Sequence, residues 1–431
     1  MTFTDAADRH YPAFSTDACI KCNVCNTVCP VARVTDLFPG PKYVGPQAQR
    51  FRDVPRSADH SVDLCSGCGF CTRACPQGVR IAETNSRARA EMVEERGSSL
   101  RNRVIADTDL LIRLGVPFAP LANFALRSRI LRWMGERVIG IHRSAALHPF
   151  ARRTFQAAVA RGRSSDDRGP DRTLIYFHGC AVNGFETSLG RDAISVLERN
   201  GFSVIVPPQS CCALPMISNG LYPQARAKAR RNLTVLGDYA RRGYRIVTTS
   251  TSCGYTLKAE YAEMLDLDDP DARAVARQTW DICELLDDLH ERGELDTRLA
   301  PLDRELPYHP PCQLKAHGIG TPAMDLFALI PGLRAWNSEH DCCGAAGTYG
   351  LKRERWQIAQ DVGRGLFARL RERPAPDMAC DSETCRWQIT ASTSIPARHP
   401  IEYLAESYRR WDAAHIGEEA PAEAATQPVA T

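Results

Sequence analysis

The spacing of the cysteines constrains the fold of this chain more than any other feature of its sequence. The 431 residues include 18 cysteines. Four of them recur with a constant offset of 46 residues, since Cys19, Cys22, Cys25 and Cys29 are matched by Cys65, Cys68, Cys71 and Cys75. A proline follows the last cysteine of each set, at Pro30 and Pro76. Four identical offsets indicate an internal duplication.

A second and longer duplication follows. Cys180, the adjacent pair Cys211 and Cys212, and Cys253 recur as Cys312, Cys342, Cys343 and Cys385, with offsets of 132, 131, 131 and 132. A repeat of this length implies two similar domains rather than a solenoid of short units.

The cysteine density favours metal binding over disulfides. The first residues show neither the basic region nor the apolar core of a secretory signal, so we expect a cytoplasmic chain, where thiols stay reduced. The longest uncharged apolar stretch, 114–126, has thirteen residues, whereas a membrane span needs about 20. The net charge of +3 is too small to predict a nucleic-acid partner.

The long repeat has the pattern of a parallel sheet. Apolar runs predict buried strands at 174–177, 203–206 and 245–248, with helices near 186–199 and 222–241. The second copy is less regular and predicts a strand at 377–380 and a helix at 352–372. Alternating strands and helices favour parallel β-sheets. Each cysteine follows the carboxyl end of a strand, which is where open α/β sheets bind ligands.

The short repeat has a recognisable metal-binding pattern. Its spacing, Cys-x2-Cys-x2-Cys-x3-Cys-Pro, is that of bacterial two-cluster ferredoxins, in which the fourth cysteine of each run binds the other cluster. On this pattern one 4Fe-4S cluster is bound by Cys19, Cys22, Cys25 and Cys75, and the other by Cys65, Cys68, Cys71 and Cys29. Zinc is the alternative, and it would leave the third cysteine of each run without a role.

The adjacent cysteines of the long repeat point to a larger metal group. Neighbouring side chains diverge and cannot both reach one small tetrahedral ion without strain, whereas a polynuclear cluster can use both. The candidate ligands are Cys180, Cys211, Cys212 and Cys253 in the first copy, and Cys312, Cys342, Cys343 and Cys385 in the second. From the residues alone, an iron–sulfur cluster, a zinc ion and a metal-free thiol pair all stay open.

Three further residues have two interpretations each. His178 and His309 each precede a cysteine of the long repeat, so they are either packed histidines or groups that tune a cluster or relay a proton. Cys283 has no cysteine nearby in the sequence, and we interpret it as a small buried hydrophobic residue.

In these features the long repeat resembles the cysteine-rich, or CCG, domains of the heterodisulfide reductase family. The full pattern of those domains ends in Cys-x2-Cys. Here Ser250 and Ser382 stand where the first cysteine of that pair would be. A serine hydroxyl is a poor iron ligand at neutral pH, so the cluster type is open; Cys380 is a candidate substitute in the second copy.

An arginine-rich segment separates the two kinds of repeat. Residues 101–163 contain twelve arginines, no lysine and three acidic residues. Arginines beside leucine, phenylalanine and tryptophan suit the surface of an anionic membrane. The alternative is a helical connector that packs on the rest of the protein or on a partner subunit. Residues 161–170 have the composition of a linker.

Some expected enzyme motifs are absent from the sequence. There is no Gly-x-Gly-x-x-Gly after a strand, no phosphate-binding loop and no Gly-x-Ser-x-Gly elbow. No flavin or nicotinamide site is therefore evident, and we assign no catalytic residue to this chain. A partner must supply its electrons.

Four stretches, 17–50, 61–83, 342–352 and 382–393, together resemble the C subunit of the anaerobic glycerol-3-phosphate dehydrogenase family, and the resemblance runs from Tyr11 to Arg410. It implies a membrane-associated iron–sulfur subunit that takes electrons from a flavoprotein and passes them to a quinone, usually menaquinone. It also implies that the eight cysteines of each repeat are cluster ligands. Related subunits serve lactate, glycolate or succinate flavoproteins.

The expected fold combines α+β and α/β parts in several domains. We expect a mainly helical two-cluster ferredoxin-type domain at 1–100, a connector and linker at 101–170, CCG domains with parallel sheets at 171–300 and 301–411, and a disordered tail at 412–431. The expected function is electron transfer from a flavoprotein dehydrogenase to quinone at the inner face of the cell membrane. A heterodisulfide reductase-like enzyme and a zinc-containing scaffold are the alternatives.

Overall fold

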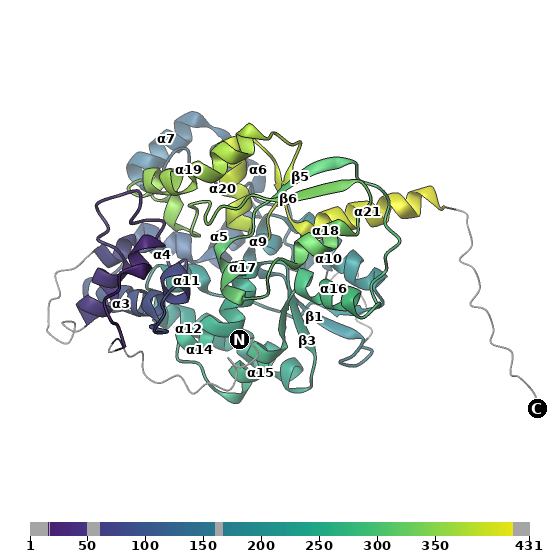
Figure 1. Ribbon diagram of the computed structural model, residues 1–431, viewed down its shortest axis with the longest axis horizontal. Coiled ribbons are helices and arrows are strands. Elements are labelled where there is room, and N and C mark those ends of the chain that lie inside the picture. The colour runs from purple at the N-terminus through teal and green to yellow at the C-terminus, as the bar shows by residue number, and fades with distance from the viewer. Residues whose placement is uncertain (1–15, 17, 50–60, 160–166, 417–431) are drawn as a thin grey trace, which may run out of the picture.

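The structure is a computed structural model that describes residues 16, 18–49, 61–159 and 167–416 (Figure 1). Its N-terminal part is helical and contains α1 (Val24–Thr27), η2 (Tyr43–Gln47), η3 (Ser61–Leu64), α2 (Phe70–Arg73) and α3 (Ile81–Arg96). Helices α1 and α2 begin and end 46 residues apart, so the short duplication extends to the backbone. The expected helical ferredoxin-type fold is confirmed for the described residues.

Helix α3 attaches this N-terminal part to the rest of the molecule (Figure 1). The buried Arg89 guanidinium donates to the carbonyl of Val62 at 3.0 Å and to that of Ser218 at 2.8 Å. The hydroxyls of Ser86 and Tyr222 form a hydrogen bond of 2.8 Å. Buried polar groups that are satisfied across an interface fix its geometry.

The arginine-rich segment is helical. It forms α4 (Leu100–Ala106), α5 (Thr108–Gly115), α6 (Ala119–Arg127), α7 (Arg129–Val138) and α8 (Phe155–Val159). Side-chain caps mark three of these starts, because Ser99, Asp107 and Ser128 accept from backbone N–H groups of the first turn. Residues 160–166, which include most of the expected linker, lie outside the described residues.

The first duplicated unit contains a four-stranded parallel sheet. Its strands are β1 (Thr173–Phe177), β2 (Ser203–Ile205), β3 (Arg245–Thr248) and β4 (Thr279–Asp281), in the order β2-β1-β3-β4. Ile175 is in register with Ile205 on one side and Ile246 on the other. The helices are α9 (Gly179–Gly184), α10 (Thr187–Arg199), α11 (Leu214–Ser218), α12 (Tyr222–Arg241), α13 (Thr251–Tyr255), η4 (Thr256–Glu260), α14 (Tyr261–Glu263), α15 (Pro270–Gln278) and α16 (Ile282–Glu291).

The second duplicated unit repeats this topology. Its strands are β5 (Arg304–Tyr308), β6 (Leu333–Asn337), β7 (Met378–Ala379) and β8 (Ala397–Arg398), again parallel and in the order β6-β5-β7-β8. The helices are α17 (Cys312–His317), α18 (Pro322–Ala328), η5 (Tyr349–Leu351), α19 (Trp356–Glu372), α20 (Glu383–Thr393) and α21 (Pro400–Ala414). The prediction of two duplicated α/β units with parallel sheets is confirmed. Helix α21 continues to Ala414, past the expected start of the tail at 412, and residues 417–431 lie outside the described residues.

The two units pack on each other through two equivalent pairs of helices and share an apolar core. Helix α10 of the first unit packs on α21 of the second, while α18 of the second packs on α16 of the first. Because α10 and α18 hold equivalent places in the two units, as do α16 and α21, these contacts are reciprocal. One apolar cluster runs through both units and includes Tyr176, Leu197, Leu306 and Leu404. The duplicated units therefore form one body.

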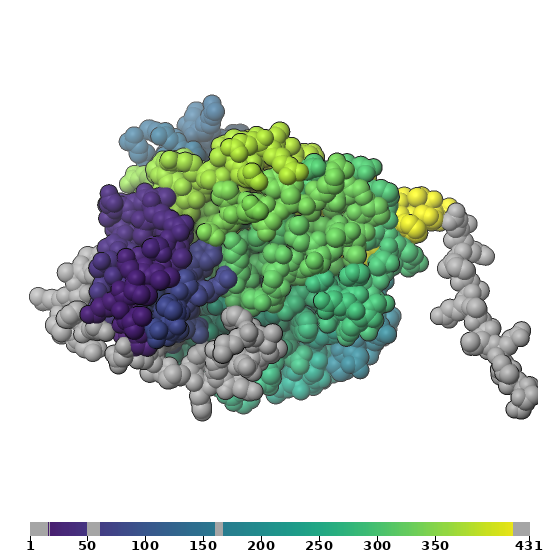
Figure 2. Space-filling model, viewed as in Figure 1, coloured from purple at the N-terminus to yellow at the C-terminus, as the bar shows by residue number. Residues whose placement is uncertain are grey.

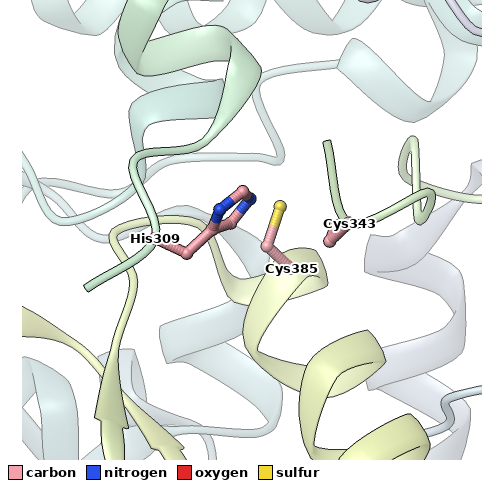
Figure 3. Close-up of side chains that lie close together, drawn as sticks. All are labelled: His309, Cys343 and Cys385. Atoms are coloured by element: carbon pink, nitrogen blue, oxygen red, sulfur yellow. The ribbon is translucent and has the colours of Figure 1, made fainter. Parts of the chain in front are cut away.

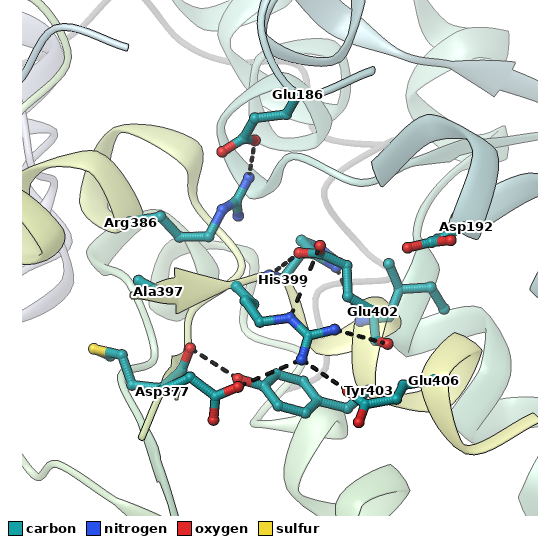
Figure 4. Close-up of polar contacts among 12 residues, drawn as sticks. Glu186, Asp192, Asp377, Arg386, Ala397, His399, Glu402, Tyr403 and Glu406 are labelled. Atoms are coloured by element: carbon teal, nitrogen blue, oxygen red, sulfur yellow. Dashed lines mark hydrogen bonds and ion pairs between the residues drawn. The ribbon is translucent and has the colours of Figure 1, made fainter. Parts of the chain in front are cut away.

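Buried charges also cross the boundary between the units (Figure 4). Arg386, in α20, pairs with Glu186, just before α10, at 2.5 Å, and the indole of Trp387 donates to the same carboxylate at 2.8 Å. Arg398, in β8, pairs with Glu406 at 2.8 Å within the second unit. A buried pair of this kind is costly to break, because the remaining charge would lose its partner.

No single described helix is long and apolar enough to cross a membrane. Helices α5 and α6 pass that test only as a pair, with a bend of 108° between them.

Candidate metal centres

The structure brings together one group of four thiols in the N-terminal part. Cys19, Cys22, Cys25 and Cys75 line a small cavity with an empty volume of about 290 Å³. Burial raises the pKa of the Cys25 thiol, and the nearby charges of Cys19, Cys75 and Cys22 raise it further. Cys22 is exposed, so this group lies at the protein surface.

A second group of four thiols lies deeper. It consists of Cys29, Cys65, Cys68 and Cys71, and three of these residues are buried. Burial raises the pKa of Cys29 to about 11, and the charge of Cys65 adds to this effect. Burial, followed by the charges of Cys65 and Cys68, raises the pKa of Cys71. The fourth cysteine of each short set therefore lies with three cysteines of the other set, the crossed grouping that the ferredoxin spacing predicts.

The loops between these cysteines have an unusual backbone. Lys21 and Gly67 have φ values of 62° and 70°, and Asn23 and Gly69 have values of 73° and 78°. These are two pairs of equivalent positions, 46 residues apart. Residues with positive φ at alternate positions curve each loop around the sulfurs that it carries. Glycine adopts a positive φ without strain, whereas lysine does so rarely.

The donor set of both groups fits an iron–sulfur cluster. Burial, and then the repulsion between neighbouring thiolates, raises the pKa values of Cys25 and Cys71. A cationic iron centre relieves this repulsion, because thiolates are its natural ligands. Backbone and side-chain donors also reach the sulfurs: Ala32 N–H lies 3.5 Å from Cys29 Sγ, and the Asn85 amide nitrogen lies 3.9 Å from Cys65 Sγ.

The first unit gathers its four cysteines behind the carboxyl ends of its strands. Cys180 lies in α9 after β1, Cys211 and Cys212 precede α11, and Cys253 lies in α13 after β3. Hydrogen bonds link Cys180 to Cys211, Cys211 to Cys212, and Cys212 to Cys253. The bond from Cys180, aided by the bond from Cys212, lowers the pKa of Cys211 well below its usual value.

The second unit repeats this chain of thiols. Hydrogen bonds link Cys312, Cys342, Cys343 and Cys385 in that order. The bond from Cys312 lowers the pKa of Cys342, and the bond from Cys343 lowers that of Cys385. Cys380 extends the chain, because it also bonds with Cys385.

The two histidines differ in their surroundings. The ring of His309 points toward Cys385, and one nitrogen of His309 and the sulfurs of Cys343 and Cys385 lie within 4.8 Å of one another (Figure 3). Its Nδ1 is 3.1 Å from Ser338 Oγ, while Nε2 has no hydrogen-bond partner among the described residues. His178 instead packs edge-on against Phe155, and burial lowers its pKa to about 4. His309 is therefore a further candidate ligand, whereas His178 packs in the core.

Of the two serines that replace the expected cysteines, Ser250 caps its helix with its side chain, whereas Ser382 forms no such hydrogen bond. The Ser250 hydroxyl accepts from the N–H of Cys253 at 3.3 Å, and it donates to the buried Glu383 carboxylate at 2.9 Å. Ser382 holds the equivalent position before α20. Ser250 thus forms hydrogen bonds with its own helix and with the other unit. The sequence shows only that a serine replaces the expected cysteine, and it did not predict this role.

Thiols of both duplicated units and one thiol of the N-terminal part line a single cavity. Its empty volume is about 1130 Å³. Cysteines from both units line it together with one cysteine of the N-terminal part: Cys68, Cys180, Cys212, Cys253, Cys312, Cys342, Cys343 and Cys385. Burial raises the pKa of Cys68, and the charge of Cys342, which lines the same cavity, raises it further. The sequence predicted the separate groups and gave no indication of their shared cavity.

The arginine-rich segment contacts the thiols of the first unit. Asp109, in α5, accepts from the N–H of Cys211 at 3.1 Å. Lys228 pairs with Asp109 at 2.6 Å and with Asp107 at 2.7 Å. Beyond these contacts, α5 to α7 expose a set of large apolar side chains: Leu114, Phe118, Leu121, Phe124, Ile130, Leu131, Trp133, Met134 and Val138. Figure 2 shows α7, in blue, projecting from the upper edge of the molecule.

Comparisons with known proteins agree with this arrangement. Residues 15–79 match the 4Fe-4S dicluster domain, and residues 174–258 and 306–390 each match the cysteine-rich domain called CCG. These matches confirm the prediction of iron–sulfur cofactors.

Whole proteins are similar as well. The C subunit of the anaerobic glycerol-3-phosphate dehydrogenase of Escherichia coli is 35% identical over 91% of this chain and 98% of its own length. The glycolate oxidase iron-sulfur subunit of the same species is 24% identical over 91% of this chain and 94% of its own length. The B subunit of the fumarate reductase (CoM/CoB) of Methanothermobacter marburgensis is 25% identical over 82% of this chain and 63% of its own length.

Proposed function

The chain belongs to the family of the anaerobic glycerol-3-phosphate dehydrogenase C subunit, an iron–sulfur subunit of flavoprotein dehydrogenases, and from this premise we propose that it relays electrons from a flavoprotein to a membrane quinone. The partner's substrate is glycerol 3-phosphate or a similar small hydroxy compound. The relative named after glycolate oxidase supports this range of substrates.

The proposed relay begins at the exposed thiol group. We assign one 4Fe-4S cluster to Cys19, Cys22, Cys25 and Cys75, and the other to Cys29, Cys65, Cys68 and Cys71. Clusters of this type accept and donate one electron at a time. The exposure of Cys22 supports electron entry from the flavoprotein at the first group.

The observation that carries the proposal is the shared cavity. Cys68 of the second group lines the same space as the cysteines of both CCG domains. We assign further iron–sulfur clusters to Cys180, Cys211, Cys212 and Cys253, and to Cys312, Cys342, Cys343 and Cys385, with His309 or Cys380 as an additional ligand in the second set. This arrangement supports transfer from the ferredoxin-type part into the CCG domains without a long gap.

We propose that electrons leave the protein for the quinone on the side of the first CCG domain. Asp109 joins α5 to the backbone of Cys211, and the exposed apolar residues of α6 and α7 continue from there. Arginines alternate with these residues, as at Arg127, Arg129 and Arg137. Apolar side chains beside arginines suit the interface of an anionic membrane, so we place this surface on the inner face of the cell membrane.

Two measurements on anaerobically purified protein test the proposal. Each 4Fe-4S cluster contributes four irons, so about twelve or more irons per chain are expected, and about eight would leave the CCG domains without a cluster. With its flavoprotein partner added, the protein should reduce a quinone analogue only when the flavoprotein's substrate is present. Quinone reduction that proceeds without this protein would contradict the relay.

A second function has one observation in its favour. The thiols of both CCG domains face one cavity, as they would in an enzyme that reduces a disulfide bound between them. The alternative is tested by supplying the isolated protein with an artificial electron donor and a small disulfide. Release of thiols at a rate comparable to quinone reduction would favour this alternative.

A further inference from the structure

A third kind of side-chain cluster lies at the boundary between the CCG domains, outside the proposed cluster ligands. Asp281, Cys283 and Asp381 each place one ligand-type atom within 4.8 Å of the others. All three are buried, with exposed fractions of 0%, 0% and 1%. Asp281 ends β4 and Cys283 lies in α16 of the first domain, whereas Asp381 follows β7 of the second. Two carboxylates and a thiol thus meet in the interior.

Neither carboxylate is fully satisfied. One oxygen of Asp281 accepts from the N–H of Cys283 at 2.9 Å, and one oxygen of Asp381 accepts from the Tyr308 hydroxyl at 2.8 Å. The second oxygen of each has no hydrogen-bond partner within the part of the chain that the structure describes. A buried carboxylate without a partner is costly, and proteins compensate for it with a counter-charge or a metal ion.

The nearest cations are already engaged. Lys258 pairs with Glu284 at 2.9 Å, and Arg386 pairs with Glu186 at 2.5 Å. Within the described residues, neither Asp281 nor Asp381 forms an ion pair with a lysine, arginine or histidine. A compensating positive charge is therefore still required at this cluster.

The fold itself does not require charged groups here. By the internal repeat, His399 caps α21 as Asp281 caps α16, and Ile401 corresponds to Cys283. Thr249 corresponds to Asp381, 132 residues earlier. The equivalent position on the other side of the boundary therefore has no carboxylate and no thiol. The fold alone does not explain why Asp281, Cys283 and Asp381 occur together.

We propose that Asp281, Cys283 and Asp381 bind one zinc ion that joins the two CCG domains. Zinc accepts mixed oxygen and sulfur ligands, with Zn–S near 2.3 Å and Zn–O near 2.1 Å, so its ligands lie within about 4 Å of one another and only a small inward shift closes the site. Binding releases the thiol proton of Cys283 to solvent and leaves a zinc–thiolate bond. The site is structural, and a water molecule fills the fourth position of its tetrahedral shell. None of its three donors is a ligand of the proposed electron relay, although Asp381 follows Cys380 in the chain.

The test uses intact protein purified anaerobically. Zinc analysis should give about one ion per chain, and X-ray absorption at the zinc edge should show one sulfur neighbour and at least two oxygen neighbours. The variant D281N/D381N should lose this zinc and keep its iron. The matched control D287N changes a partly exposed aspartate in α16, the helix that contains Cys283, and this variant should keep both zinc and iron.

Other results would overturn the proposal. Zinc with sulfur neighbours alone would belong to the CCG thiols instead. Zinc that persists at one ion per chain in D281N/D381N would also exclude this site. If intact protein incubated with excess zinc chloride and then desalted holds no zinc, the two carboxylates are neutralised by a shared proton. The spectroscopic measurement on unmodified protein decides the matter even if the variant does not fold.

Discussion

Lys352 is a buried ionisable side chain whose pKa is strongly shifted by its surroundings. Its ammonium group is buried, with 2% of the residue exposed, and donates to the Asn219 side chain at 2.9 Å. Burial lowers the pKa of Lys352 to about 7, and the positive charge of Arg355 contributes to this shift. The folded protein therefore holds this lysine less firmly protonated than the unfolded chain does.

The pH dependence of stability follows from this shift. The folded pKa is below the unfolded value of 10.5, so between about pH 7 and pH 10 the unfolded chain binds more protons and rising pH favours folding. From pH 7 to pH 9 the contribution to the free energy of unfolding rises by about 2 kcal/mol. The variant K352M should lack this rise, which is measured as the difference between its thermal unfolding midpoint and that of the wild type at each pH.

A neighbouring exposed residue provides the control. Arg353 lies next to Lys352 and is exposed, so R353M should follow the wild type across the same pH range. If K352M and the wild type change in parallel from pH 7 to pH 9, the lysine is not deprotonated in this range and the predicted shift is wrong.

Single residues also show which parts of the candidate sites could be predicted from the sequence. The sixteen cysteines of the two repeats were identified from spacing alone, because a repeated motif is visible without a structure. Cys283 was interpreted as an isolated buried hydrophobic residue. It is buried, yet it lies beside Asp381, which is about one hundred residues away in the sequence. The sequence left the role of His309 open and did not indicate the contact between Ser250 and Glu383, because the partners of both residues come from another part of the chain.

At the scale of elements, the exposed faces of α6 and α7 are the most unusual feature. Leu121 is 70% exposed and Phe124 is 64% exposed, although both are large and apolar. Contiguous exposed apolar surface marks an interaction site. The arginines beside it favour an anionic membrane over a neutral one.

A vesicle assay tests this surface. The double variant L121E/F124E places two negative charges on α6 and should reduce binding to vesicles containing phosphatidylglycerol by roughly tenfold or more, because two apolar side chains no longer enter the interface. Binding is measured by co-sedimentation of the intact protein.

The control variant changes a similar residue elsewhere. Ile416 is 84% exposed and follows α21 in the chain, and Figure 1 shows α21 and α7 on different sides of the molecule. The variant I416E should therefore bind vesicles like the wild type. Equal binding by all three proteins would mean that α6 packs on a partner subunit instead.

The elements themselves were predictable where they are long or apolar. Strands β1, β2 and β3 lie at the predicted runs, and the predicted helix at 352–372 is α19 (Trp356–Glu372). Strands β4, β5, β6 and β8 were not predicted, because none of them contains a run of four apolar residues. In the structure β4 pairs with β3, and β8 pairs with β7.

At the scale of the whole molecule, the shared cavity connects the two kinds of repeat. Cys68 is the cysteine of the N-terminal part that lines this cavity, together with Cys342 and other cysteines of the CCG domains. The variant C68S should slow quinone reduction by about tenfold or more, because a transferred electron would have to pass a cluster with a weakened ligand set. Dye reduction by the flavoprotein alone should not change.

Ser66 lines the same cavity and carries no thiol, which makes S66A the matched control for C68S. Quinone reduction by S66A should equal that of the wild type. If C68S also keeps the full rate while its second cluster is lost, electrons reach the CCG domains by another route.

The crossed arrangement of the chain has a consequence for biosynthesis. The ferredoxin-type cysteines are complete once Cys75 has left the ribosome, whereas the second CCG set needs Cys385, which emerges 310 residues later. At usual rates of synthesis this delay is about 15 to 60 s. Because segments from the beginning, middle and end of the chain line the cavity, a metal group in the second CCG domain can be inserted only after Cys385 has emerged and before these segments dock. The cysteines of the two kinds of repeat therefore become available to bind metal at different times.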